Sequence, residues 1–243
     1  MPAGAGSKEG DHMRLDKYLA DMGIGTRSQV KDLIRKRSVQ VNGVIQTDPG
    51  FQVQEDDRVD FDGKEIIYEE FEYFMLNKPQ GVVSATEDAL YPTVLSLIHD
   101  SQRKDLFPVG RLDLDTEGLL LITNDGALAH RLLSPNHHVD KTYLVTIEET
   151  MPTTAVQMFE QGVELYGDGQ TMPAKLEVLT EHTGLLTIQE GKYHQIKRMF
   201  AAIGCKVTGL KRLSMGPLTM DESLEPGQYR RLTAEEREEL RKW

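Results

Sequence analysis

The sequence is poor in cysteine and has no long apolar run. Its 243 residues include one cysteine, Cys205, so an internal disulfide and a thiolate cluster for zinc are both excluded, and we expect a reducing cytoplasm. No apolar run approaches the roughly 18 residues of a membrane span, and we expect no membrane partner. The opening stretch, MPAGAGSKEGDH, lacks the apolar core of a signal peptide. We interpret residues 1–12 as a tag remnant or disordered leader, with Met13 as the native start.

Positive charge is also in the minority. The chain has 28 Lys and Arg against 39 Asp and Glu, a net charge of −11, which taken alone argues against a nucleic-acid binder. The distribution changes this conclusion, because Met13 to Thr47 carries seven positive and three negative residues. Salt screens charges beyond about 8 Å, so a local basic face matters more to a polyanion than the sum over the chain.

The segment from Met13 to Gly63 has the pattern of a small helical and hairpin module. Apolar residues recur at helical spacing from Leu15 to Met22, and Thr26 with Gln29 forms a capping box for a second helix. Three basic residues recur every four positions on the outer side of that helix: Arg27, Lys31 and Arg35. An Asn-Gly turn between valine-rich strands then predicts a hairpin.

This module resembles the small RNA-binding domain named after a small-subunit ribosomal protein, on the residues MRLDKYLADMGIGTRSQVKDLIRKRSVQVNG. A charge run alone is more often a solvated helix face, but the two helices followed by the hairpin favour RNA binding. The resemblance implies that six side chains contact RNA, positioning the phosphates without reading sequence: Arg14, Lys17, Arg27, Ser28, Lys31 and Arg35.

The rest of the chain predicts a second domain. Residues 64–72 are acidic and lack a clear period, so we place a linker there, followed by a domain over residues 73–243. Its predicted strands outnumber its predicted helices and do not alternate strictly with them. This pattern favours an α+β fold on a mixed, mainly antiparallel sheet.

The stretch GRLDLDTEGLLLITNDG, residues 110–126, carries the candidate chemistry. It places Asp113 and Asp115 in a glycine-bounded loop before an apolar run that predicts a buried strand. A magnesium site of the Asp-x-Asp-x-Thr kind fits poorly, because Glu117 stands where that pattern needs threonine. The alternative is one working carboxylate kept ionised by a cation, either Arg111 or a distant lysine or arginine. Spacing alone does not decide which carboxylate works.

Three stretches together resemble the pseudouridine synthases of the small-subunit rRNA type, the RsuA type: LNKPQGVVSAT, VGRLDLDTEGLLLITNDG and EGKYHQIKRMFAAIG. HRLLSPNHHVDKTYLVTIE is similar too, so the likeness covers nearly all of the chain from Met13 onward. The resemblance implies a catalytic domain over residues 73–243 that converts a uridine of 16S rRNA to pseudouridine without a cofactor or metal. It also implies ribosomal RNA or a partly assembled small subunit as partner, and we expect a monomer.

The resemblance assigns roles to four residues. Asp113 becomes the catalytic carboxylate, which either attacks the ribose or initiates its deprotonation. Tyr143 stacks on the target base, Lys197 pairs with the aspartate, and Arg111 fills the gap left by the flipped-out uridine. We expect His194 to be a hydrogen-bonded structural histidine and leave it out of the catalytic set.

Two other functions stay open at this stage. One is a large-subunit, 23S rRNA pseudouridine synthase, which the loop sequence does not exclude. The other is a non-catalytic rRNA-binding assembly factor that keeps the fold. An intact acid, tyrosine and lysine argues against a pure binder, since a carboxylate facing a polyanion weakens phosphate binding.

Overall fold

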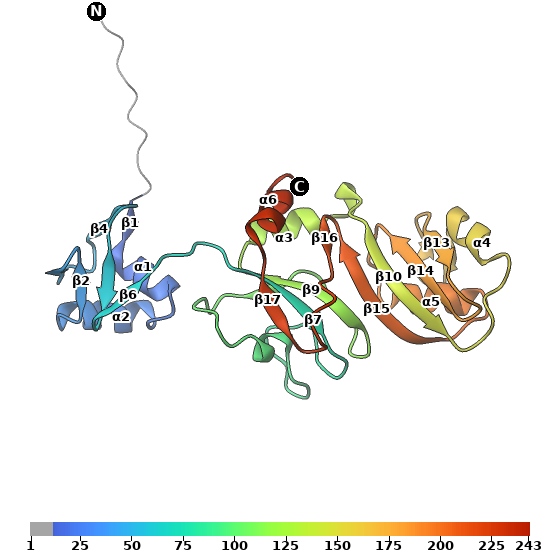
Figure 1. Cartoon of the computed structure of the whole chain (residues 1–243), viewed down its shortest axis with the longest axis horizontal. Helices are drawn as coiled ribbons and strands as arrows, with labels where there is room; N and C mark the ends of the chain where they lie inside the picture. Colours follow the sequence, from blue (N-terminus) through green and yellow to red (C-terminus); the bar gives the residue numbers. More distant parts are fainter. Residues whose placement is uncertain (1–11) are drawn as a thin grey trace, which may run out of the picture. The chain divides into compact units, whose positions relative to one another are not determined.

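The computed structural model describes residues 12–243, which form two compact units (Figure 1). The N-terminal unit ends at Phe71 and also includes Asp100–Asp105. The C-terminal unit comprises Glu72–His99 and Leu106–Trp243. The tag or leader assigned to residues 1–12 lies outside the described residues except for His12.

The N-terminal unit packs two helices, α1 (Leu15–Asp21) and α2 (Arg27–Arg35), with short strands. A four-stranded sheet has the order β3-β2-β5-β6, and β1 pairs separately with β4. The strand bounds are β1 Met13–Arg14, β2 Val39–Val41, β3 Val44–Ile45, β4 Gln52–Val53, β5 Val59–Phe61 and β6 Lys64–Ile66. Both predicted helices and the predicted hairpin of β2 and β3 are confirmed.

Local chemistry accounts for these elements. The capping box at Thr26 is present: its hydroxyl accepts from the Gln29 amide, and the Gln29 side chain accepts from the Thr26 amide. The same helix buries Val30 and Ile34 completely against the unit's core. The helix therefore needs both its cap and its apolar stripe to be stable at nine residues.

Two segments of the N-terminal unit differ from the expected layout. Lys64–Ile66, which we placed in the linker, forms β6 and pairs with β5, because Asp62 and Gly63 both take positive φ and close a tight hairpin. Asp100–Asp105 comes from much later in the chain. Within this segment Arg103 is bound to Asp105 at 2.7 Å and lies 3.9 Å from Asp21 of α1.

The C-terminal unit is built on one large sheet with the order β13-β14-β10-β15-β9-β7-β17, to which β8 and β16 attach (Figure 1). Only the β15–β9 pair is parallel among these neighbours. The predicted mixed, mainly antiparallel sheet is confirmed. The strand bounds are β7 Tyr73–Lys78, β8 Phe107–Pro108, β9 Glu117–Thr123, β10 Lys141–Ile147, β13 Lys175–Val178, β14 Thr183–Ile188, β15 Val207–Met215, β16 Leu218–Thr219 and β17 Tyr229–Arg231.

Helices cover this sheet, and a small hairpin stands beside it. Strands β11 (Glu164–Leu165) and β12 (Gly169–Gln170) pair only with each other. The helix bounds are α3 Gly126–Leu133, α4 Ala155–Gln161, α5 Gln195–Ala202 and α6 Ala234–Arg241, with 3-10 turns at Val94–Leu97 and Pro135–His137.

Strand β9 is buried on both faces. Leu120 and Ile122 belong to one apolar cluster, and Leu119 and Leu121 belong to another. Successive side chains of a strand point to opposite faces, so the unbroken apolar run is what a central strand between two cores requires. The acidic loop that precedes β9 is therefore anchored to a strand that is buried on both faces.

Candidate functional site

The site is organised by the loop from Arg111 to Thr116, between β8 and β9. Gly118 follows it with φ of +103°, and a Cβ built there would stand 2.2 Å from the Arg212 carbonyl oxygen of β15. Any side chain at this position would therefore strain both the backbone and the parallel β9–β15 pairing. The glycine lets two strands approach closely at the point where the loop enters the sheet.

A buried lysine holds the backbone of the loop. Lys78, at the end of β7, has no exposed surface, and its Nζ donates to three backbone carbonyls. These belong to Pro79 at 3.0 Å, Asp113 at 2.9 Å and Thr116 at 2.8 Å. Burial lowers the pKa of Lys78 to about 8, although Asp115 and Asp113 oppose that shift. One ammonium thus fixes the backbone of Asp113 without touching its carboxylate.

The segment after β7 also holds the backbone of the loop through hydrogen bonds. The Ser84 hydroxyl donates to the Leu112 carbonyl and accepts from the Leu112 amide, both at 3.0 Å. The Gly81 amide donates to the Leu114 carbonyl at 2.8 Å. The residues on either side of Asp113 are therefore both tied to the turn after Lys78.

The Asp113 carboxylate faces a cation from α5. Lys197 Nζ donates to Asp113 Oδ2 at 3.0 Å and to Asp115 Oδ1 at 2.5 Å. Burial acts to lower the pKa of Lys197, but the hydrogen bonds to the two carboxylates outweigh it and raise that pKa. The same hydrogen bond holds the pKa of Asp115 below its usual range. The Asp113 side chain keeps 29% of its surface exposed, so its carboxyl group is open to a ligand.

His194 also belongs to this site, although the sequence analysis left it out. Its Nε2 lies 3.6 Å from Asp113 Oδ1, and its ring stacks on that of Tyr193 with centroids 3.8 Å apart. The residue precedes α5 with a left-handed φ of +46°. Its place directly before Gln-Ile-Lys, three residues from Lys197, is the sequence signal that it shares the site.

The other two predicted substrate residues differ in how far they are exposed. Tyr143 on β10 is 7% exposed and packs in the same apolar cluster as Leu112 and Ile196, the neighbours of Asp113 and Lys197. Arg111 is exposed, and within residues 12–243 no hydrogen bond or ion pair holds its side chain. It is therefore available to a ligand, whereas Tyr143 offers only a small part of its surface.

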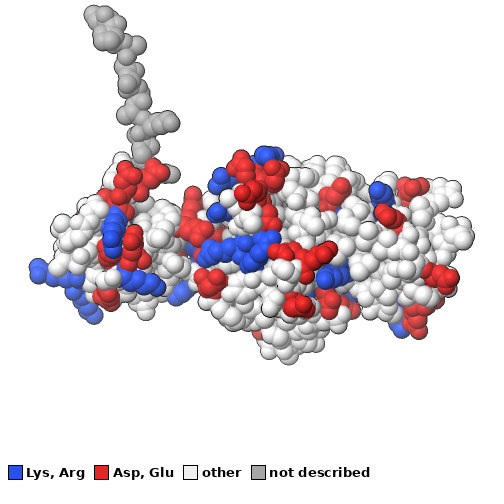
Figure 2. Space-filling view, viewed as in Figure 1, with Lys and Arg blue, Asp and Glu red and all other residues white. Residues whose placement is uncertain are grey.

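The predicted RNA-binding residues of the N-terminal unit are on its surface. Figure 2 shows basic side chains along the lower edge of this unit, with acidic ones among them. Asp16, only 2% exposed, binds Arg14 at 3.0 Å and lies 3.7 Å from Lys31. The hydrogen bond from Arg14 keeps the pKa of the Asp16 carboxyl below its usual value. The other four, Lys17, Arg27, Ser28 and Arg35, are at the surface too.

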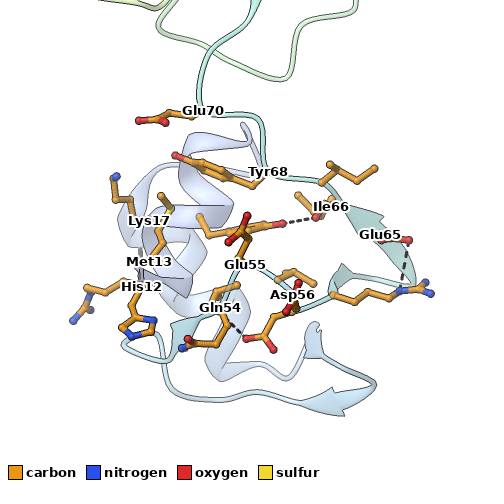
Figure 3. Close-up of a pocket in the computed structure, with 17 residues that line it drawn as sticks. His12, Met13, Lys17, Gln54, Glu55, Asp56, Glu65, Ile66, Tyr68 and Glu70 are labelled. Atoms are coloured by element: carbon orange, nitrogen blue, oxygen red, sulfur yellow. Dashed lines mark hydrogen bonds and ion pairs between the residues drawn. The ribbon is translucent and has the colours of Figure 1, made fainter. Parts of the chain in front are cut away.

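A pocket of about 1110 Å³ opens in the same unit, and Arg14 and Lys17 are among the residues that line it (Figure 3). Four carboxylate residues labelled in the close-up line it: Glu55, Asp56, Glu65 and Glu70. These carboxylates share the lining with Arg14, Lys17 and Arg58, so the pocket presents charges of both signs. This pocket is not the candidate catalytic site, because none of the residues of the acidic loop lines it.

Residues 12–243 contain no group of three or more His, Cys, Asp or Glu side chains arranged to hold a metal ion. None of the helices in this range has both the length and the apolar character to cross a bilayer.

Comparison with known families matches this site to a catalytic domain. The family model described as RNA pseudouridylate synthase matches residues 72–202, more than half of the chain, and an S4 domain model matches residues 13–59. The chain belongs to the RNA pseudouridylate synthase family. The matched span contains the acidic loop, Tyr143 and the helix that carries Lys197. The protein is thus a pseudouridine synthase, an isomerase that needs no cofactor, with an RNA-binding domain before its catalytic domain.

Individual relatives match over almost their whole length. The chain is 47% identical over 225 residues to "Ribosomal small subunit pseudouridine synthase A" of Vibrio cholerae, covering 92% of this chain and 97% of that protein. It is 48% identical over 230 residues to "Uncharacterized RNA pseudouridine synthase YtzG" of Bacillus subtilis, covering 92% and 96%. A solved structure titled "Crystal structure of pseudouridylate synthase" aligns with a TM-score of 0.67 at 44% identity, covering 94% and 99%.

Proposed function

We propose that this pseudouridine synthase modifies a uridine of 16S rRNA in the bacterial cytoplasm, acting as a monomer on RNA or a partly assembled small subunit. Relatives named for the ribosomal small subunit support the substrate, since they match at 44–47% identity over 92–94% of this chain. The S4 domain match supports binding of structured RNA. The N-terminal cations supply the phosphate contacts that such binding needs.

The observation that carries the proposal is the Asp113 carboxylate, partly exposed and paired with Lys197. In the proposed reaction Asp113 acts on the ribose of a flipped-out uridine, either as nucleophile at C1′ or as the base that begins deprotonation. The N1–C1′ bond breaks, the uracil turns, and a C5–C1′ bond forms. C5 loses its proton and N1 ends protonated, so atoms and charge balance within one nucleotide.

The remaining site residues have supporting roles in this proposal. Lys197 orients the Asp113 carboxyl group through its hydrogen bond, and Tyr143 contacts the target base. Arg111, exposed beside Asp113, takes the space that the flipped uridine leaves in the RNA. Extruding a nucleotide costs a few kcal/mol, which such a filling side chain offsets.

The test is release of tritium from 16S transcripts labelled at C5 of uridine, with 23S transcripts in parallel. We expect release from 16S rRNA only, and Asp113→Asn should slow it by at least about 10²-fold. Asp115→Asn is the matched control, because that carboxylate is more exposed and also binds Lys197. Release from 23S rRNA alone would make the large-subunit function correct. Tight binding of rRNA without tritium release from either transcript would show that the protein is a non-catalytic assembly factor.

A further inference from the structure

Two tyrosines beside α5 are largely exposed to solvent. Tyr193, just before α5, is 75% exposed, and Tyr166, in the turn between β11 and β12, is fully exposed. Scattered apolar side chains on a surface are ordinary. These two differ because the protein holds both of their backbones with the same side chain.

That side chain is Arg198 of α5. Its Nη2 donates to the Tyr166 carbonyl at 2.7 Å, and its Nη1 donates to the Tyr193 carbonyl at 3.1 Å. The guanidinium also pairs with Asp168 of the β11–β12 turn. A planar guanidinium presents its donors in a fixed fork, so both backbone segments are held at a set separation.

A second basic residue reinforces the same arrangement. Lys192 Nζ donates to the carbonyls of Asp168 at 3.1 Å and Gln170 at 3.0 Å. The β11–β12 hairpin, which pairs with no other strand of the C-terminal unit, is thus tied to the segment that precedes α5. The two exposed rings therefore rise from a fixed support.

The exposed Tyr193 is connected to the catalytic site through His194. The Tyr193 ring stacks on His194 at an interplanar angle of 19°, and His194 Nε2 lies 3.6 Å from Asp113 Oδ1. The left-handed backbone of His194 is uncommon for a side chain of this kind, and such conformations cluster at ligand sites. The stacked rings of His194 and Tyr193 therefore extend from the Asp113 carboxylate to the exposed surface.

We propose that Tyr193 and Tyr166 form a stacking site for an unpaired base that neighbours the target uridine in the RNA. The proposal rests on the proposed function, since it takes the flipped uridine to be at Asp113. Flipping a nucleotide leaves its neighbours without a stacking partner, and proteins hold such single-stranded bases on aromatic rings. Lys192, Lys197 and Arg198 are each paired with a carboxylate, so this site would hold the RNA base through the rings and not through net positive charge.

The test uses the full chain and a short single-stranded oligoribonucleotide carrying one 2-aminopurine, whose fluorescence falls when it stacks. Tyr193→Leu and Tyr166→Leu keep apolar bulk but remove the flat ring. We expect each to weaken binding by about ten-fold and to reduce the quenching. The matched variants Tyr193→Phe and Tyr166→Phe keep the ring and should bind within about two-fold of the parent. Trp243→Leu, which removes an exposed aromatic at the chain end, should have no effect.

Steady-state kinetics on the 16S transcript completes the test. We expect the leucine variants to raise KM by about ten-fold and leave kcat within roughly three-fold, because the ring binds RNA and does no chemistry. Unchanged binding in both leucine variants, or equal loss in leucine and phenylalanine variants, would overturn the stacking site. Failure of the proposed function shows differently, as absent tritium release by the parent, while the fluorescence readout does not require turnover.

Discussion

Lys197 and Asp113 are joined by a hydrogen bond of 3.0 Å across 84 positions of sequence. The same ammonium reaches Asp115, so one cation from α5 serves both carboxylates of the acidic loop. A lysine offers a point charge, with three donors, where an arginine would offer a planar fork. The pairing therefore orients Asp113 through one contact and leaves its second oxygen facing His194 and the open side of the site.

Replacing Lys197 tests this relationship. Lys197→Met leaves two carboxylates close together without their shared cation, and we expect kcat to fall roughly 10²-fold with little change in KM. Lys197→Arg keeps the charge but changes the geometry, so its activity should lie between parent and methionine variant. Tritium release under saturating RNA measures both. Lys175→Met, at an exposed position of β13, is the matched control. A methionine variant with parental kcat would show that Asp113 needs no cation.

Removal of the Lys78 ammonium should loosen the catalytic loop. Lys78→Met leaves three carbonyls without their donor, and we expect the free energy of unfolding to fall by about 2–4 kcal/mol. Urea denaturation measures the change. Lys141→Met is the matched control, because Lys141 is also buried but donates to one carbonyl only, that of Val139. Equal losses in the two variants would mean that burial of the lysine, and not the triple contact, sets the effect.

The lowered pKa of Lys78, about 8, predicts opposite effects of pH on stability and activity. Between that value and about 10.4 the unfolded chain keeps a proton that the folded chain has released. The contribution of Lys78 to the free energy of unfolding therefore rises with pH, by up to about 1.4 kcal/mol per unit. Activity should fall over the same range, because a neutral amine has two donors for three carbonyls. Denaturation and tritium release from pH 7 to 10 would show both trends in the parent; an identical pH slope of stability in Lys78→Met would contradict this assignment.

Gly118→Ala should be among the most destabilising small substitutions in the chain. The added Cβ would stand 2.2 Å from the Arg212 carbonyl at a positive φ, so β9 and β15 must separate or the backbone must change. We expect a loss of more than about 3 kcal/mol in thermal or urea unfolding. Gly126→Ala, at the first position of α3 with no heavy atom within 4 Å of the added carbon, should be neutral or slightly stabilising. Parental stability in the Gly118 variant would show that the strands accommodate a side chain.

RNA contacts of the N-terminal unit should appear in the salt dependence of binding. Arg27→Ala and Arg35→Ala should each reduce the slope of log affinity against log salt by about 0.7 to 0.9, as expected for one lost phosphate contact. Filter binding of the full chain to a 16S transcript measures the slope. Arg58→Ala is the matched control, since Arg58 is equally exposed but is bound to Asp60 on β5, beside the pocket. The same change in slope in this control would show that the loss is not specific to the cations of α2.

Several features of this protein could be read from the sequence because they depend on neighbours in the chain. The capping box at Thr26, the hairpin at Asn42 and the buried strand β9 are set by a few adjacent residues and by local periodicity. The resemblance of the acidic loop and the His-Gln-Ile-Lys stretch to one family also needed only the order of residues, and the family match confirmed it. Lys64–Ile66 is an exception among these local features. Its sequence has no clear hydrophobic period, and it forms a strand because the tight turn before it brings it beside β5.

Only the tertiary structure decided which distant groups meet. The three carbonyls on Lys78, the contact of His194 with Asp113 and the hold of Arg198 on two tyrosines all depend on strand register and on where α5 packs. β17 pairs with β7 across more than half of the chain, and Asp100–Asp105 joins the N-terminal unit although most of its sequence neighbours belong to the other. Contacts of this kind are chosen by the packing of the whole core, because the free energy that favours them is shared among many residues and no short stretch of sequence contains it.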